Sequence, residues 1–147
     1  APGRRLVWFA HAGADAGRVS ALQAQGADTI DLPGPGGKVD LDALMHELAR
    51  REVNEVHVEA GARLNASLLR EGQVDELLVY LAPALLGQGA GMAPFGPLQG
   101  LAARVPLRWR EVKAVGDDLR ITAVVSGRDT FLGAGATVSG ADLLQTK

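Results

Sequence analysis

The alternation of apolar runs with helical segments constrains the fold more than any other feature of this sequence. Residues 4–11, 28–33, 54–61 and 75–83 each form a short apolar run that predicts a β-strand. The intervals between these runs have helical composition, and the clearest helical spacing of apolar residues follows Asp40. Because strands that alternate with helices are joined by crossover connections, the chain is predicted to have an α/β fold with a parallel sheet.

Residues that commonly start and stop helices mark the ends of these predicted helices. Asp15 and Asp40 each precede a helical segment and can accept a hydrogen bond from its first turn. Gly26 and Gly72 follow helical segments, where glycine often ends a helix by adopting a positive φ. We therefore expect one helix between Asp15 and Gly26, one after Asp40, and one that ends at Gly72.

The pattern changes in the second half of the chain. The run at 75–83 is almost continuously apolar, so we expect this strand to be covered on both faces, as in a parallel sheet. Residues 85–97 are rich in glycine and proline and predict an irregular loop. Residues 107–125 form two alternating runs around a Gly-Asp-Asp turn, which predicts an antiparallel hairpin. Residues 126–147 show little apolar periodicity and are expected to form a peripheral or disordered tail.

Composition excludes several classes of function. The 147 residues are 47% hydrophobic and 22% charged, which is typical of one soluble globular domain. The net charge is −2 and no dense basic stretch occurs, so we expect no nucleic-acid partner. The chain has no cysteine, which excludes thiolate zinc sites and cysteine nucleophiles. The absence of cysteine also suits a cytoplasmic protein. The apolar runs are far too short to span a bilayer, so we expect no membrane partner.

The segment Glu59-Ala60-Gly61 is the strongest candidate site. It places a carboxylate and a glycine at the end of a predicted strand, and ligands of open parallel sheets bind outside the carboxyl ends of the strands. Glycine allows a ligand to approach the backbone closely, and the small-residue segment 62–67 begins a helix whose free N–H groups could hold a phosphate. The alternative interpretation is a plain strand-to-helix turn with an exposed glutamate, since glycine turns are common.

Other candidate sites are less consistent with the sequence. The pair His57 and Glu59 matches half of the zinc-deaminase pattern, but the other half requires cysteines. The glycine-rich segment 85–91 lacks the lysine and the Ser/Thr of a P-loop, and no serine lies in a G-x-S-x-G elbow. The pair Asp117-Asp118 fits a hairpin turn better than a metal site. No metal site is therefore predicted.

Several segments occur together in an order that resembles one known family. The chain is similar, over residues 6–125, to the reductase domain of the riboflavin-biosynthesis bifunctional deaminase–reductase. The matching elements, in chain order, are Glu59-Ala60-Gly61, Leu64, Val74-Asp75-Glu76-Leu77, Ala82-Pro83 and Leu85-Leu86-Gly87.

The resemblance implies a fold and an activity. The fold would be dihydrofolate-reductase-like: α/β, with a mostly parallel sheet, flanking helices and a C-terminal antiparallel hairpin. The activity would be the NADPH-dependent reduction of 5-amino-6-(5-phosphoribosylamino)uracil to its ribitylamino product, with hydride transfer to C1′ of the sugar. The resemblance also implies a small-molecule substrate and a homodimer. Glu59 would contact the substrate, and the cofactor-binding residues would be Gly61, Ala62, Arg63, Leu64, Asn65, Ala66 and Ser67.

Two departures from the family pattern lead to further expectations. Ala60 replaces the first glycine of a Gly-Gly pair, and the resemblance implies that the Ala60–Gly61 peptide is cis although such a bond costs roughly 3–4 kcal/mol. The region that precedes Leu6 in the family is not in this sequence. We therefore expect residues 1–125 to be the C-terminal portion of the reductase domain and residues 126–147 to be the tail.

Two other functions fit the same residues. The first is a related reductase of the same fold that acts on another pyrimidine or on a pteridine. The second is a non-catalytic dimerisation module whose nucleotide site has been lost. Retention of Glu59, Gly61 and the small-residue helix start disfavours the second, whereas the missing front of the domain favours it.

Overall fold

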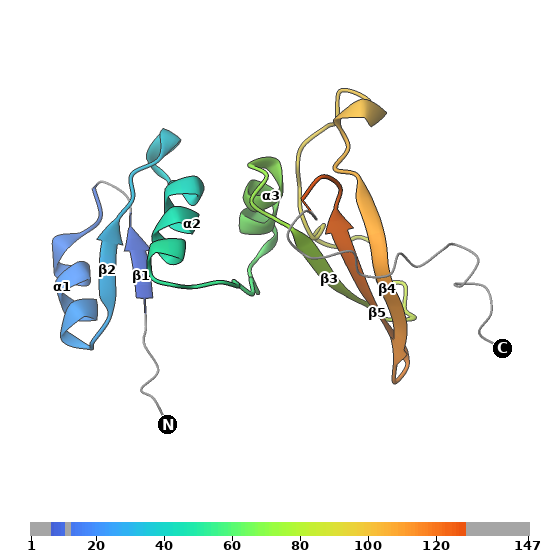
Figure 1. Cartoon of the computed structure of the whole chain (residues 1–147), viewed down its shortest axis with the longest axis horizontal. Coiled ribbons are helices and arrows are strands. Elements are labelled where there is room, and N and C mark those ends of the chain that lie inside the picture. Colours follow the sequence, from blue (N-terminus) through green and yellow to red (C-terminus); the bar gives the residue numbers. More distant parts are fainter. Residues whose placement is uncertain (1–6, 11–12, 129–147) are drawn as a thin grey trace. The chain divides into compact units, whose positions relative to one another are not determined.

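The computed structural model describes residues 7–10 and 13–128, and the chain divides into two compact units, residues 1–58 and 59–147 (Figure 1). Each unit combines helices with strands, so the α/β class predicted from the sequence is confirmed. No helix in the described ranges has both the length and the apolar character that a bilayer crossing requires.

The first unit contains a parallel strand pair and two helices. Strand β1 (Val7–Ala10) pairs in parallel with β2 (Asp28–Asp31), and helix α1 (Ala16–Ala24) connects them. A short 3₁₀ turn, η1 (Pro35–Gly37), leads to helix α2 (Leu41–Arg50). The predicted strand–helix–strand order is therefore confirmed in this unit.

Aspartate side chains start both helices of the first unit, as predicted. The Asp15 carboxylate accepts a hydrogen bond from Arg18 N at 2.8 Å, and the Asp40 carboxylate accepts one from Ala43 N at 2.9 Å. These bonds satisfy N–H groups that a helix cannot pair within itself. Gly26 follows α1 with a φ of +85°, where a side chain would be strained.

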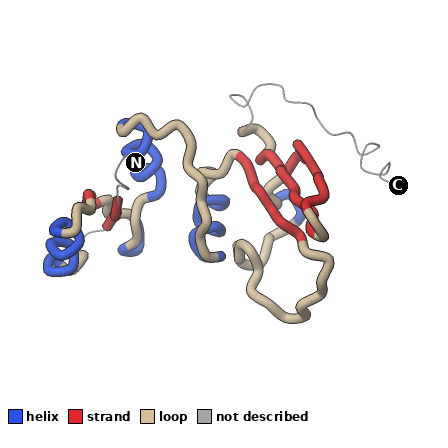
Figure 2. The backbone as a smooth tube through the Cα atoms, turned by 90° about the horizontal axis from the view of Figure 1, so that it is seen from below, coloured by secondary structure: helices blue, strands red, loops and turns tan. Residues whose placement is uncertain are grey.

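The second unit contains one helix and an antiparallel sheet. Helix α3 (Ala62–Arg70) precedes strand β3 (Glu76–Leu81), and a long segment with a 3₁₀ turn, η2 (Leu101–Ala103), leads on to the last two strands. Strands β4 (Leu107–Val115) and β5 (Asp118–Val125) complete a sheet of order β3-β5-β4, in which both pairings are antiparallel (Figure 1). Figure 2 shows the strands in red.

The C-terminal hairpin predicted from the sequence is confirmed. Val115 pairs with Asp118 across a two-residue turn. Gly116 occupies the first turn position with a φ of +61°, the conformation that a type II′ hairpin turn requires there. The register shifts between Trp109 and Glu111, which marks a bulge in β4.

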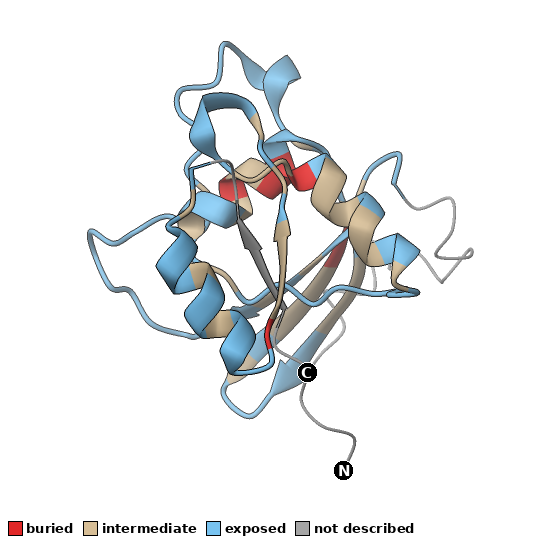
Figure 3. Ribbon diagram, turned by 90° about the vertical axis from the view of Figure 1, so that its left-hand side faces the viewer, coloured by how far each residue is buried: buried red, intermediate tan, exposed pale blue. Residues whose placement is uncertain are grey.

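The buried apolar residues of the second unit come from α3 and β5 (Figure 3). Their side chains are at most 9% exposed and belong to Ala66, Leu68, Leu69, Ala123 and Val124. In the first unit the corresponding residues are Ala27 and Leu41. Ala66 and Leu69 are three positions apart and therefore lie on the same face of that helix.

Several sequence predictions differ from the structure. Residues 53–60 form no helix or strand, so the strand predicted at 54–61 is wrong. The alternating valines of this segment, Val56 and Val58, are 44% and 42% exposed. An apolar alternation becomes a strand only when a neighbouring strand supplies a hydrogen-bonded ladder, and no described strand pairs with this segment.

The predicted burial of the strand at 75–83 is also wrong. In the structure β3 pairs only with β5 in the described sheet, and Leu78 and Tyr80 remain 45% and 56% exposed. Antiparallel strands commonly have one face exposed, so an apolar run does not by itself require cover on both faces. The mostly parallel dihydrofolate-reductase-like sheet is accordingly not confirmed, because parallel pairing in the described residues is limited to β1 and β2.

The expected cis peptide is absent. No peptide bond of the described residues is cis, which includes Ala60–Gly61. The cost of a cis bond before a residue other than proline persists only where the surrounding structure enforces it, and Glu59 and Gly61 are both exposed. The predicted tail lies outside the described residues from 129 onward.

Candidate functional site

The N-terminus of α3 is the centre of the candidate site. Gly61 is the N-cap residue and supplies no side-chain hydrogen bond. The N–H groups of Leu64 and Asn65 donate to Gly61 O at 3.1 and 3.2 Å. This leaves the first-turn N–H groups of Ala62 and Arg63 without an acceptor inside the helix.

This helix start differs from the other two in charge. Helices α1 and α2 begin with aspartate caps, whereas α3 has neither a side-chain cap nor an acidic residue in its first turn. The first turn of α3 instead carries the exposed Arg63. Free N–H groups, the positive end of the helix dipole and a guanidinium together favour an anionic ligand over a cationic one.

Gly61 leaves open space at this helix start. Its φ of −73° and ψ of 162° are accessible to any residue, so the backbone conformation does not require glycine. A Cβ atom built at Gly61 would meet no other atom within 4 Å. The glycine is therefore not explained by packing within the chain, and the space is available for a ligand to approach the backbone.

The other predicted site residues differ in how far they are exposed to solvent. Glu59 is exposed and lies two residues before Gly61 in the chain. Leu64 is 42% exposed, whereas Ala66 is 3% exposed and belongs to the core. The Ser67 hydroxyl accepts a hydrogen bond from Arg70 Nη2 at 3.1 Å. The first turn of α3 is thus accessible to a ligand, and the Ala66 side chain is not.

Asn65 contacts a segment that is distant in sequence. Its side-chain nitrogen donates to Ala60 O at 3.4 Å and to Met92 O at 3.3 Å. Met92 lies in the glycine-rich loop that follows β3. The sequence predicted this loop but not its contact with α3.

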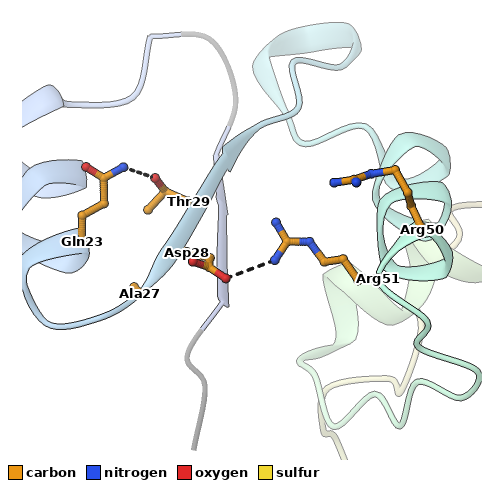
Figure 4. Close-up of a pocket in the computed structure, with 6 residues that line it drawn as sticks. All are labelled: Gln23, Ala27, Asp28, Thr29, Arg50 and Arg51. Atoms are coloured by element: carbon orange, nitrogen blue, oxygen red, sulfur yellow. Dashed lines mark hydrogen bonds and ion pairs between the residues drawn. The ribbon is translucent and has the colours of Figure 1, made fainter.

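A second polar hollow, which the sequence did not predict, lies in the first unit (Figure 4). It has a volume of about 610 Å³ and is lined by Gln23, Ala27, Asp28, Thr29, Arg50 and Arg51. Both guanidinium groups are already paired. Arg50 donates to Glu47 at 2.8 and 2.7 Å, and Arg51 donates to Glu47 at 2.8 Å and to Asp28 at 3.2 Å.

These ion pairs explain the hollow as part of the structure rather than as a binding site. Arg51 follows the last turn of α2 and reaches Asp28 on β2, so it joins the helix to the strand. The signal in the sequence was the spacing of Glu47 to the two arginines, because residues three and four apart are neighbours on a helix. No local signal in the sequence indicates that Arg51 also pairs with Asp28 on β2.

The stability of this ion-pair network should depend on pH. Hydrogen bonds from Arg50 and then Arg51 lower the pKa of Glu47 from 4.5 to about 2. Since the folded pKa is the lower one, the stabilisation is present above pH 4.5 and is lost as the pH falls toward 2. Glu47→Gln should therefore be less stable than the unmodified chain at neutral pH, and this difference should shrink in urea titrations repeated down to pH 2.5.

Glu55 supplies the control for this pH experiment. Glu55→Gln changes an exposed glutamate in a segment without helix or strand. Its difference from the unmodified chain should stay small at every pH. A Glu47→Gln difference that did not change with pH would contradict the assigned role of the network.

No metal site is found among the residues that the structure describes. These residues contain no group of three or more His, Cys, Asp or Glu side chains that could hold a metal ion. Asp117 and Asp118 lie at the turn between β4 and β5, as the sequence predicted.

Comparison with known proteins shows the family to which the chain belongs. A family model described as the RibD C-terminal domain matches residues 5–123. The riboflavin biosynthesis protein RibD of Escherichia coli (strain K12) is 37% identical over 114 residues, which cover 77% of this chain and 30% of that protein. A protein of Buchnera aphidicola subsp. Acyrthosiphon pisum, 5-amino-6-(5-phosphoribosylamino)uracil reductase, is 28% identical over 85 residues, covering 57% of this chain and 41% of that protein.

A solved structure supports the fold. A pyrimidine reductase-like protein from Corynebacterium diphtheriae superposes with a TM-score of 0.65 at 18% identity, covering 81% of this chain and 49% of that one. The chain thus spans less than half the length of each of these three proteins. Because the family model covers most of the sequence, the chain belongs to the RibD C-terminal domain family.

Proposed function

We propose that this chain forms the cofactor-binding part of a reductase that converts 5-amino-6-(5-phosphoribosylamino)uracil to the ribitylamino product with NADPH. The observation that carries the proposal is the N-terminus of α3, which has no side-chain cap, no acidic residue in its first turn and open space at Gly61. This helix start occurs in a chain of the RibD C-terminal domain family. The Buchnera relative is named as a reductase of this compound.

The residues at the start of α3 fit a dinucleotide. Its phosphates would be held by the N–H groups of Ala62 and Arg63, with the Arg63 guanidinium available as a counter-ion. NADPH, when bound, supplies the hydride that reduces C1′ of the sugar. The chain's own contribution is to bind the cofactor and to fix its position relative to the substrate.

Glu59 is proposed to bind the substrate. Its carboxylate is exposed two residues before the phosphate-binding turn, where it can accept hydrogen bonds from hydroxyl or amino groups of a phosphoribosylaminopyrimidine. This role is one of orientation, and no proton transfer is assigned to Glu59. The homodimer expected from the family resemblance also stays a prediction.

Thermal unfolding with and without nucleotide tests the proposed function. A ligand at about 100 times its dissociation constant stabilises the folded state by roughly 2.7 kcal/mol, which should raise the midpoint by several degrees. We expect such a rise with millimolar NADPH and a smaller one with NADH, because NADPH carries the additional phosphate. The absence of a rise with either nucleotide would contradict the proposal.

A further inference from the structure

Asn65 joins the two segments that lie on either side of the α3 start. Its carboxamide nitrogen donates both to Ala60 O and to Met92 O, at 3.4 and 3.3 Å. A carboxamide nitrogen carries two hydrogens, so it can form both bonds at once. The donor capacity of this side chain is therefore already used within the chain.

The bond to Ala60 affects the turn at Gly61. The Ala60–Gly61 peptide is trans and planar, so its C=O and N–H groups point in opposite directions. A hydrogen bond that holds Ala60 O therefore also fixes the direction of Gly61 N–H. Asn65 thus restrains the backbone immediately before the free N–H groups of α3.

The bond to Met92 affects the loop after β3. No charged residue occurs between Ala82 and Ala103, and the side chains of Leu85 and Leu86 are almost fully exposed. Within the described part of the chain, the bond from Asn65 to Met92 O joins residues 85–99 to α3. Asn65 therefore supplies a polar attachment of this loop to α3.

We propose that Asn65 is a positioning residue of the nucleotide site. By donating hydrogen bonds to the carbonyl oxygens of Ala60 and Met92, a pair of bonds called the clasp below, Asn65 holds the loop at 85–99 beside the start of α3. This inference rests on the proposed function of that helix start. Asn65 acts through the backbone that it holds, and its amide hydrogens do not contact the cofactor. The loop then forms one side of the space in which the nucleotide lies.

Limited proteolysis of the unliganded full chain tests the clasp. Asn65→Leu keeps the number and branching of the side-chain heavy atoms, introduces a good helix former and removes both donors without changing the charge. Chymotryptic cleavage after Met92 and Phe95 should become about five- to tenfold faster, because the loss of one or two neutral hydrogen bonds raises the population of the open loop. Cleavage after Tyr80 and Trp109, which lie on strands, should not change.

Two further variants make the cleavage result specific. Ser67→Ala alters the same helix without touching the loop and should leave cleavage after Met92 unchanged. Asn65→Gln retains the carboxamide and should restore part of the protection. Unchanged loop cleavage in Asn65→Leu would overturn the clasp.

Nucleotide titration then tests the positioning role. NADPH should bind Asn65→Leu about fivefold or more weakly than the unmodified chain, and protection of the loop from cleavage should require a correspondingly higher NADPH concentration in the variant. Faster cleavage with unchanged NADPH affinity would overturn the positioning role. An unmodified chain that binds no nucleotide would refute the proposed function, whereas the cleavage rates would still decide whether the clasp exists.

Discussion

Gly61→Asp should abolish the NADPH-dependent rise in the unfolding midpoint, whereas Gly61→Asn should retain part of it. Both side chains are good N-caps, and both fit the open space and the ordinary backbone angles at this position. Without nucleotide, each variant should thus be as stable as the unmodified chain or a few tenths of a kcal/mol more stable. The two variants differ mainly in one negative charge at the start of α3.

The size of the expected effect follows from electrostatics. A carboxylate about 4 Å from a phosphate near a protein surface is repelled by up to about 4 kcal/mol, which is more than enough for a hundredfold loss of affinity. At a nucleotide concentration that is about 100 times the original dissociation constant, the remaining stabilisation would be only about 0.4 kcal/mol. Calorimetry with NADPH at low and high salt should show that added salt reduces the penalty.

The two variants separate two reasons why a glycine at position 61 would favour nucleotide binding, the absence of a side chain and the absence of a negative charge. If Gly61→Asn binds as weakly as Gly61→Asp, the turn accommodates the ligand through the absence of a side chain rather than through charge. If Gly61→Asp keeps the full NADPH shift, the cofactor does not lie at this helix start, and the proposed binding role of the turn is wrong.

Local signals in the sequence predicted local structure well. The aspartate caps of α1 and α2 and the turn at Gly116 are confirmed, because each depends on residues that are close in the chain. The signal for the candidate site at Gly61 is also local, since it consists of a glycine directly before a small-residue helix start, but the binding role of this turn stays a prediction. The sequence also predicted the irregular loop after β3 from its glycine and proline content.

Features that depend on distant residues could not be predicted in the same way. The segment at 54–61 has the alternation of a strand, but whether it pairs depends on a neighbour elsewhere in the chain. The contact of Asn65 with Met92 joins residues 27 positions apart, and neither residue type indicates it. The ion pair of Arg51 with Asp28 is similar, because its partners are 23 positions apart.

Helix α3 also offers a test that separates stability from binding. Leu64 and Leu68 lie one turn apart on this helix, but their side chains are 42% and 4% exposed. Leu68→Ala should destabilise the chain by about 2–5 kcal/mol, because it removes buried methyl groups and leaves a cavity. The same truncation at Leu64 removes less buried surface and should cost about 1 kcal/mol or less.

The loss of NADPH affinity should be larger for Leu64→Ala than for Leu68→Ala, which is the opposite of the order expected for stability. Leu64 belongs to the exposed first turn that is proposed to bind the cofactor, so Leu64→Ala should reduce NADPH affinity without a large change in the nucleotide-free midpoint. Leu68→Ala should lower that midpoint by roughly 5–15 °C, but molecules that remain folded should bind NADPH as before. Urea unfolding followed by circular dichroism gives the stability, and isothermal titration at 10 °C gives the affinity. If Leu68→Ala weakened binding more than Leu64→Ala at a temperature where both are folded, the nucleotide would depend on the core side of α3 rather than on its exposed first turn.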